Sequence, residues 1–162
     1  MTLILLDGPS GSGKTVLAGR IRDGWVGADR PTIVHLDDVY PGWDGLESAS
    51  EHIAEHLLEP LRAGREARWR RYDWARAEPA EWHVVDPAHP LLVEGCGALS
   101  RRNAALADLA IWVETDDVTR KRRALERDGE LYEREWERWD AQWQSFVARE
   151  RPRELATVVV PT

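Results

Sequence analysis

The chain has 162 residues, with 22 basic and 29 acidic side chains and a formal net charge of −7. At about 100–200 residues per domain, this length predicts one domain spanning residues 1–162, long enough to build a core. The acidic balance argues against a broad nucleic-acid-binding face, the single cysteine rules out an internal disulfide, and no apolar run could span a bilayer. We therefore expect a soluble cytoplasmic protein without nucleic-acid or membrane partners.

Two residue types are used unevenly. Nine of the aromatic residues are Trp, against three Tyr and one Phe, and the only lysines are Lys14 and Lys121 among 22 basic residues. Indoles usually serve cores, interfaces or stacking surfaces, and Lys differs from Arg in the way it binds phosphate. Both biases therefore bear on the search for a site.

Short apolar runs alternate with longer amphipathic stretches, a pattern that predicts βαβ units and a mostly parallel sheet. Strands are predicted at residues 2–6, 32–36, 91–93, 109–113 and 157–160, with an Arg-rich alternating stretch at 67–74 as an edge strand. Helices are predicted at about 14–23, from Ser48 or Ser50 to 61, at 100–107, from Asp116 or Asp117 to 127, and at 130–150. Pro152 ends the last of these helices, and no repeat or linker interrupts the chain.

The segment from Gly8 to Thr15 reads GPSGSGKT and fits the phosphate-binding pattern G-x-x-x-x-G-K-[ST] between a predicted strand and a predicted helix. Its backbone N–H groups can surround a phosphate, Lys14 can reach the β- and γ-phosphates, and the Thr15 hydroxyl can ligate Mg²⁺. A simple glycine turn and a dinucleotide fingerprint are weaker interpretations, because neither needs the Lys-Thr pair. The predicted nucleotide-binding residues are Gly8, Ser10, Gly11, Ser12, Gly13, Lys14 and Thr15.

Carboxylates end two further predicted strands. Asp37 and Asp38 follow the second strand, and Glu94 follows residues 91–93. Side chains at the carboxyl ends of parallel strands face the ligand crevice. One of the aspartates could take a proton from an attacking hydroxyl or hold Mg²⁺ through water, and Glu94 suits a water-mediated Mg²⁺ contact; the alternative is that all three are ordinary loop carboxylates.

Four segments resemble, in order, the motifs of uridine kinase-like P-loop kinases, a family that includes pantothenate kinase and phosphoribulokinase. They are LDDVY at 36–40, RYDW at 71–74, VEG at 93–95 and the stretch from Thr119-Arg120 to Arg127-Asp128. The resemblance covers nearly the whole chain. It implies an α/β P-loop kinase fold, with a five-stranded mostly parallel sheet flanked by helices and a mobile helical lid at about 127–136. It also implies transfer of the γ-phosphoryl group of MgATP to a hydroxyl of a small molecule, with a nucleoside-like acceptor expected.

The same resemblance implies individual roles. Asp37 resembles the base that faces the acceptor hydroxyl and also lies near the metal, and Glu94 resembles the acidic residue near magnesium. The residues implied for acceptor binding are Asp37, Tyr40, Trp43, Asp44, Tyr72 and Arg134. Phosphate contacts are implied for Arg120 toward the nucleotide and for Arg123 and Arg127, with Lys14, in catalysis.

Three departures concern the acceptor. The segment between Asp37 and Tyr72 is shorter than in uridine kinases, the pyrimidine-reading His of the family falls near Ala77, and Tyr132-Glu133-Arg134 replaces the Arg-Gly pair of the lid. The reaction type is therefore carried over to this chain, and the particular nucleoside is not.

Three other patterns allow two interpretations each. His52-Ile53-Ala54-Glu55-His56 matches a zinc-peptidase pattern, but it lacks a third ligand and we interpret it as two solvated histidines. Six arginines between 62 and 76 are expected on a solvated surface, although their convergence on a cleft would favour an anionic acceptor. Aromatic residues from Tyr132 to Phe146 form a helical stripe that predicts burial, either in the core or against a partner subunit of a homo-oligomer, with a substrate-stacking surface as the alternative.

A second hypothesis belongs to another class: a nucleotide-dependent switch that hydrolyses its nucleotide slowly and signals to a protein partner. Its motivation is the altered acceptor site. A GTPase would need an Asn-Lys-x-Asp element to read the base, and the only lysine beyond the phosphate loop lies in Arg120-Lys121-Arg122.

Overall fold

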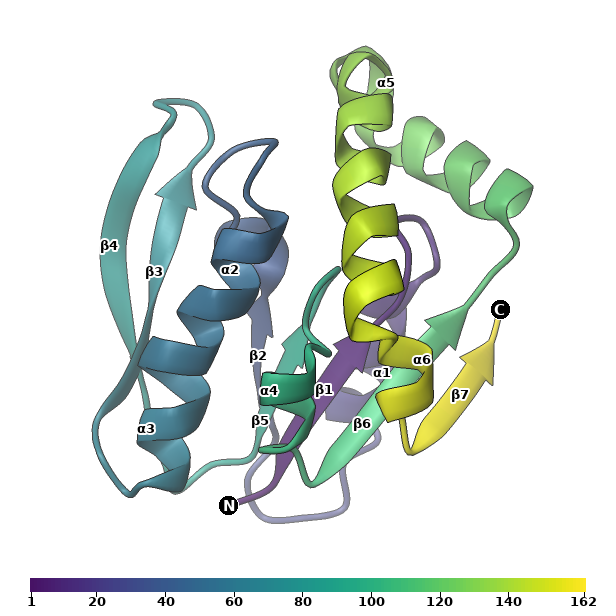
Figure 1. Ribbon diagram of the computed structural model, residues 1–162. Helices are drawn as coiled ribbons and strands as arrows, with labels where there is room; N and C mark the ends of the chain where they lie inside the picture. Colours follow the sequence, from purple (N-terminus) through teal and green to yellow (C-terminus); the bar gives the residue numbers. More distant parts are fainter.

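Five parallel strands form the central sheet of the computed structural model, which describes residues 1–162 (Figure 1). The strands are β1 (Leu3–Asp7), β2 (Thr32–His35), β5 (Leu91–Glu94), β6 (Leu109–Glu114) and β7 (Val158–Pro161), in the spatial order β2-β5-β1-β6-β7. Each neighbouring pair is parallel. The predicted α/β fold with a five-stranded sheet is therefore confirmed.

Helices cover both faces of this sheet and make three layers. Along β1, Leu3 and Leu5 belong to a large core on one face, whereas Ile4 and Leu6 belong to a smaller core on the other. This alternation follows from the two-residue period of a strand, and it explains why a strand buried on both faces is apolar throughout. Helix α1 (Lys14–Asp23) packs on the smaller core through Leu17, Ala18 and Ile21.

The opposite face carries the other helical segments. A continuous helical stretch consists of α2 (Leu46–Ile53), a π-helical turn η2 (Ala54–Leu58) and α3 (Glu59–Arg62). The remaining segments are the 3₁₀ turn η1 (Leu36–Asp38), α4 (Arg101–Ala104), α5 (Asp117–Glu150) and α6 (Pro152–Leu155). The helix predicted at 100–107 is thus a single turn, capped by the Ser100 side chain, which accepts a hydrogen bond from the Asn103 N–H.

Helix α5 consists of two arms that meet at Gly129, whose φ of 71° and ψ of −158° are not helical. The arms correspond to the two helices predicted on either side of residue 129, and Figure 1 shows the second arm returning across the sheet toward α6. The aromatic stripe of the second arm is buried, and the Trp143 ring stacks on Trp112 of β6 with 5.7 Å between centroids. The predicted burial of the stripe is therefore confirmed, and within this chain the stripe packs in the core.

The Arg-rich strand does not join the central sheet. Strand β3 (Ala67–Asp73) pairs with β4 (Glu78–Val85) in a separate antiparallel hairpin, seen beside α2 in Figure 1. The strand predicted at 67–74 is present, and it belongs to this hairpin rather than to an edge of the central sheet. The alternation of exposed and half-buried residues in β3 fits any one-sided ribbon, so it does not identify the neighbouring strand.

The two histidines of the zinc-like pattern pack against this hairpin. His52 Nε2 accepts a hydrogen bond from the Arg70 backbone N–H at 3.0 Å, and the Trp82 ring lies 5.4 Å from the His52 ring and 5.3 Å from that of His56. Both side chains are therefore half-buried against the hairpin, so the prediction of two solvated histidines was only partly right. No group of three or more His, Cys, Asp and Glu side chains is arranged to hold a metal ion.

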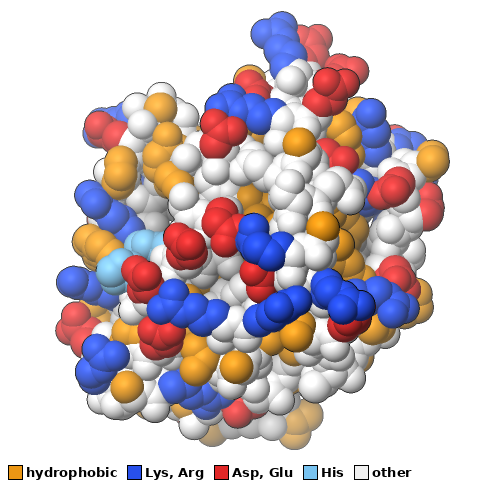
Figure 2. Space-filling view, in the orientation of Figure 1, with side chains coloured by type: hydrophobic (Ala, Val, Ile, Leu, Met, Phe, Trp, Pro, Cys, Tyr) orange, Lys and Arg blue, Asp and Glu red, His pale blue; other side chains and the backbone are white.

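Charged side chains of both signs are interspersed over the face shown in Figure 2. None of the helices is both long enough and apolar enough to cross a membrane.

Candidate active site

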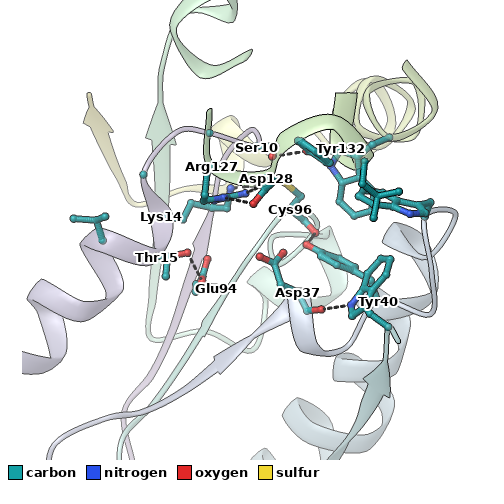
Figure 3. Close-up of a pocket in the computed structure, with 17 residues that line it drawn as sticks. Ser10, Lys14, Thr15, Asp37, Tyr40, Glu94, Cys96, Arg127, Asp128 and Tyr132 are labelled. Atoms are coloured by element: carbon teal, nitrogen blue, oxygen red, sulfur yellow. Dashed lines mark hydrogen bonds and ion pairs between the residues drawn. The ribbon is translucent and has the colours of Figure 1, made fainter. Parts of the chain in front are cut away.

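A cavity of about 720 Å³ opens beyond the carboxyl ends of β1, β2 and β5 (Figure 3). It is lined by Ser10, Gly11, Gly13, Lys14, Thr15, Val16, Asp37, Tyr40, Trp43, Trp74, Glu94, Cys96, Arg127, Asp128, Leu131, Tyr132 and Trp139. Crevices at this end of a parallel sheet are the usual ligand sites of open α/β folds. The cavity therefore joins the phosphate loop, the two strand-end carboxylates and α5.

The phosphate loop depends on glycine at its close approaches. Gly11 has a φ of 80°, and a Cβ at this position would collide with the Arg120 carbonyl of α5. Gly13, with a φ of 93°, immediately precedes α1, so the helix N-terminus and its free N–H groups face the loop. The sequence forms this turn because glycine adopts such angles without steric cost.

Lys14 is held inside the loop. Its Nζ donates to the carbonyl oxygens of Gly8 at 2.8 Å and Pro9 at 2.9 Å, and the residue is only 8% exposed. The Cys96 sulfur lies 3.7 Å from the same nitrogen. The ammonium charge is thus fixed at the position where the motif predicts a phosphate.

Thr15 and Glu94 form the expected pair of oxygen groups. The Thr15 hydroxyl donates to Glu94 Oε1 at 2.9 Å, and the same oxygen is 2.6 Å from His35 Nδ1 (Figure 3 shows the Thr15 contact). Burial alone would raise the pKa of Glu94, but the hydrogen bond with His35, the nearby Lys14 charge and the Thr15 hydroxyl together lower it. The carboxylate is therefore ionised at neutral pH, and His35 has a raised pKa because of the same hydrogen bond.

These groups fit Mg²⁺ by their chemistry. A hydroxyl and carboxylates are hard oxygen donors, and Mg²⁺ in phosphate-transfer sites is typically bound by one or two such groups together with substrate phosphates and water. Thr15, Glu94 and Asp37 all line the cavity. The same lining contains one sulfur group, that of Cys96, and no imidazole. A dedicated cluster of protein ligands is not required for this ion.

Asp37 lies between the phosphate loop and the aromatic side of the cavity (Figure 3). Its pKa is raised, first because the surrounding protein limits hydration of the carboxylate and then because Glu94 carries a like charge, while Lys14 and Arg127 act in the opposite direction. The Trp74 indole N–H donates to the Asp37 carbonyl at 2.8 Å and fixes this backbone segment. A carboxylate with a raised pKa is a stronger proton acceptor once ionised.

Some predicted residues lie together and others do not. Ser10, Gly11, Gly13, Lys14, Thr15, Asp37, Tyr40, Trp43, Glu94 and Arg127 line the cavity, and Gly8 and Ser12 belong to the buried part of the loop. Tyr72 lines a smaller neighbouring cavity, and Asp44 forms an ion pair with Arg138. The acceptor-binding set predicted from the sequence is therefore divided between two cavities and the surface.

The four arginines predicted at the site lie in different places, and only Arg127 lines the cavity. Arg127 reaches the cavity, where Asp128 binds its guanidinium through two hydrogen bonds of 2.8 and 2.6 Å. Arg120 is buried and paired with Asp117 and Asp140, so its guanidinium already has two partners. Arg123 and Arg134 are exposed outside the cavity.

Sequence analysis missed several residues at this site, of which Asp7, Tyr132 and Cys96 are the most informative. Asp7, at the end of β1, accepts the backbone N–H groups of Gly8 at 2.7 Å, Leu99 at 2.8 Å and Gly97 at 3.2 Å, and burial raises its pKa to about 6. Tyr132 donates to the Ser10 hydroxyl at 2.6 Å, which joins α5 to the loop, and Cys96 lines the cavity. An aspartate at the end of an apolar strand, directly before the motif, was the available signal for Asp7.

The parallel sheet, the phosphate loop between β1 and α1, and the carboxylates at the ends of β2 and β5 together define a P-loop kinase fold. A solved structure from Bacillus stearothermophilus, described as that of a possible uridine kinase, matches with a TM-score of 0.66 at 17% identity, covering 98% of this chain and 88% of that one. At this level of identity the match shows the fold alone.

Curated relatives are more similar in sequence. A uridine kinase of Halobacterium salinarum is 30% identical over 136 residues, which cover 75% of this chain and 60% of the relative. A uridine kinase of Lactobacillus johnsonii is 30% identical over 141 residues, covering 78% of the chain and 67% of that protein. The chain belongs to the uridine kinase-like family of P-loop kinases. The matches span about 60–67% of the length of these relatives, and no protein-family model matches the chain.

Proposed function

We propose that this protein is a small-molecule kinase that transfers the γ-phosphoryl group of MgATP to a hydroxyl of its acceptor. The observation that carries the proposal is that Lys14, Thr15 and Asp37 open into one cavity. The relatives named uridine kinase support the same reaction class. They do not support the alternative of a partner-stimulated nucleotide switch.

The phosphate loop binds and orients the donor in this proposal. Backbone N–H groups at the start of α1 and the Lys14 ammonium receive the phosphate oxygens, and Arg127 adds a second positive charge from α5. Bound Mg²⁺, held by the Thr15 hydroxyl with Glu94 and Asp37, would neutralise phosphate charge. Glu94 stays ionised for this role because His35 and Thr15 stabilise its carboxylate.

Asp37 acts as the base. Its carboxylate accepts the proton of the acceptor hydroxyl as that oxygen attacks, and the backbone contact from Trp74 holds it in place. The acceptor itself lies against Tyr40 and Trp43. We further propose that residues 1–162 act as one kinase domain and that the segment around 127–136 closes over the cavity as a lid, which excludes water from the transfer.

The substitution Asp37→Asn tests the assignment of the base. The variant should keep its affinity for a non-hydrolysable ATP analogue while acceptor-stimulated ADP release falls by about 100-fold or more. Asp38→Asn is the matched control, because Asp38 does not line the cavity, and it should retain most of the parent rate. Screening nucleosides and other small alcohols with the parent protein supplies the acceptor for this comparison, and a parent-like rate in Asp37→Asn would refute the role of Asp37.

A further inference from the structure

The acceptor side of the cavity is walled by aromatic rings. Figure 3 shows Lys14 and Thr15 on one side, Tyr40 and Tyr132 on the other, and Asp37 between them. The Trp43 ring centroid lies 5.2 Å from that of Trp74, 5.4 Å from Tyr132 and 6.4 Å from Trp139. Rings at these distances touch one another, so they form a continuous apolar wall rather than separate side chains around a gap.

Most polar groups of this wall already have partners. The Tyr40 hydroxyl donates to the Cys96 carbonyl at 2.8 Å, the Tyr132 hydroxyl to Ser10 Oγ at 2.6 Å, and the Trp74 indole to the Asp37 carbonyl at 2.8 Å. None of the 17 residues that line the cavity is Asn, Gln or His. Reading the edge of a heterocycle requires side chains that both donate and accept hydrogen bonds, and the wall offers none that is free to do so.

The cations of the cavity are not available to an anionic acceptor, because the proposed function assigns Lys14 and Arg127 to the phosphates of the donor. Arg127 is bound by Asp128 through two hydrogen bonds, and Asp37 contributes a negative charge. On the hairpin, Arg71 is paired with Glu81 at 2.6 Å and Arg68 lies 4.6 Å above the Trp82 ring, so neither enters the cavity. The interpretation that the Arg-rich segment binds an anionic acceptor therefore has no support in the geometry.

We propose that the acceptor is an uncharged alcohol that carries a flat aromatic ring, and that the site selects it by the face of the ring and by neutrality rather than by the hydrogen-bonding edge. This inference rests on the proposed kinase function. A consequence is broad tolerance among rings: purine and pyrimidine nucleosides should be used with similar efficiency, because every base presents a π-face.

Three kinds of compound test the proposal with the parent protein and Mg²⁺. Uridine, cytidine, adenosine and guanosine vary the ring edge, ribose removes the ring, and 3′-uridylic acid adds charge while keeping a free 5′-hydroxyl. Calorimetric titration measures binding, and ADP formation measures transfer. We expect the four nucleosides to lie within about tenfold of one another in affinity and in kcat/KM, and ribose and 3′-uridylic acid to be weaker by about 100-fold or more.

The two readouts separate this inference from the kinase proposal. Preference for one nucleoside by about 1,000-fold, or a better response to 3′-uridylic acid, would overturn the ring-face inference and leave the kinase proposal standing. Ring-dependent binding of all four nucleosides without ADP formation would leave the inference standing and refute the kinase proposal. Absence of nucleoside binding by a protein that binds an ATP analogue would overturn the inference.

A matched pair of indoles tests the wall itself. Trp43→Ala should raise the KM of each nucleoside about tenfold or more with unchanged affinity for the ATP analogue. Trp82→Ala is the control, because Trp82 lies on the hairpin outside the cavity and should leave both values unchanged. Circular dichroism checks folding, and Trp74→Ala, at a side chain already 40% exposed, replaces Trp43→Ala if that variant does not fold. Parent-like nucleoside KM values in a folded variant would contradict the inference.

Discussion

At the residue scale, Asp7 fixes the start of the phosphate loop. Its carboxylate binds one N–H of the loop, from Gly8, and two from the turn after β5, from Gly97 and Leu99, so it ties the two segments together at the end of β1. Sequence analysis did not identify it, because an acidic residue after an apolar strand reads as a loop residue until its backbone partners are known. The residues of the loop itself were predictable, since Gly and Lys at fixed spacing reflect local geometry.

Asp7 makes stability depend on pH. Burial raises its pKa to about 6 from an ordinary value of 3.8, so in this window the folded protein keeps a proton that the unfolded chain has released. The contribution of Asp7 to stability is therefore largest at low pH, and it falls by up to about 3 kcal/mol as the pH rises from 4 to 6.

The substitution Asp7→Asn removes this titration. Urea unfolding of parent and variant is measured at pH 4, 5 and 6. The unfolding free energy of the variant minus that of the parent should increase as the pH rises. A difference that stays constant across the window would contradict the assignment.

At the element scale, the helices and strands with strong local signals were predictable. Helix α1 begins and ends at the predicted residues, because the phosphate motif fixes its start and Gly24 follows its end. The β3–β4 hairpin could not be predicted in this way. Its turn contains Ala77 at a φ of 55°, a position where glycine or asparagine is the usual sequence signal for a chain reversal. The sequence therefore contained no turn pattern that would have predicted strand β4.

Gly129 determines the shape of α5 and of the proposed lid. Its φ and ψ lie in a region that essentially only glycine occupies, and no atom lies within 4 Å of where a Cβ would be. Gly129→Ala therefore introduces backbone strain without a steric clash, and we expect the strain to change the angle between the two arms and so to displace Arg127 from its place at the cavity. We expect kcat to fall about tenfold while the main unfolding transition changes little.

Gly19→Ala is the matched control for this variant. Gly19 is helical and also has no atom near a Cβ, so the substitution should stabilise α1 by roughly 0.5–1 kcal/mol without changing kcat. Steady-state rates and thermal unfolding of both variants make the comparison. A parent-like kcat in Gly129→Ala would show that the angle between the arms does not matter for turnover.

At the scale of the whole molecule, the site depends on contacts between distant segments, and these limited what sequence could predict. The stripe that contains Tyr132 was correctly expected to be buried, but the contact of Tyr132 with Ser10, 122 residues away, places the same residue at the cavity. Arg120 was expected near phosphate, whereas Asp140 on the other arm of α5 holds it in a buried pair. Periodicity identifies the face of a helix, and only the assembled fold identifies what that face meets.

Binding at the phosphate loop should stabilise the entire fold. A non-hydrolysable ATP analogue with Mg²⁺ at 100 times its Kd adds about 2.7 kcal/mol, which raises the Tm of a domain of this size by about 5–10 °C. Lys14→Arg should remove the shift even though the charge is kept, because the planar guanidinium does not fit between the Gly8 and Pro9 carbonyls. Lys121→Arg, at an exposed position, is the control and should show the same increase in Tm as the parent protein. An increase in Tm in Lys14→Arg equal to that of the parent would refute the phosphate-loop assignment.

Because the chain has only two lysines, chemical labelling of amines can report on the exposure of the buried Lys14. An amine-acylating reagent can reach the terminal amine and the exposed Lys121 directly, whereas Lys14 is enclosed by its own loop. Acylation of the peptide that contains Lys14, followed by mass spectrometry over time, would therefore count the openings of the loop, with Lys121 as an internal standard in the same molecule. With only two lysines in the chain, the rate of acylation at Lys14 would measure how often the phosphate loop opens.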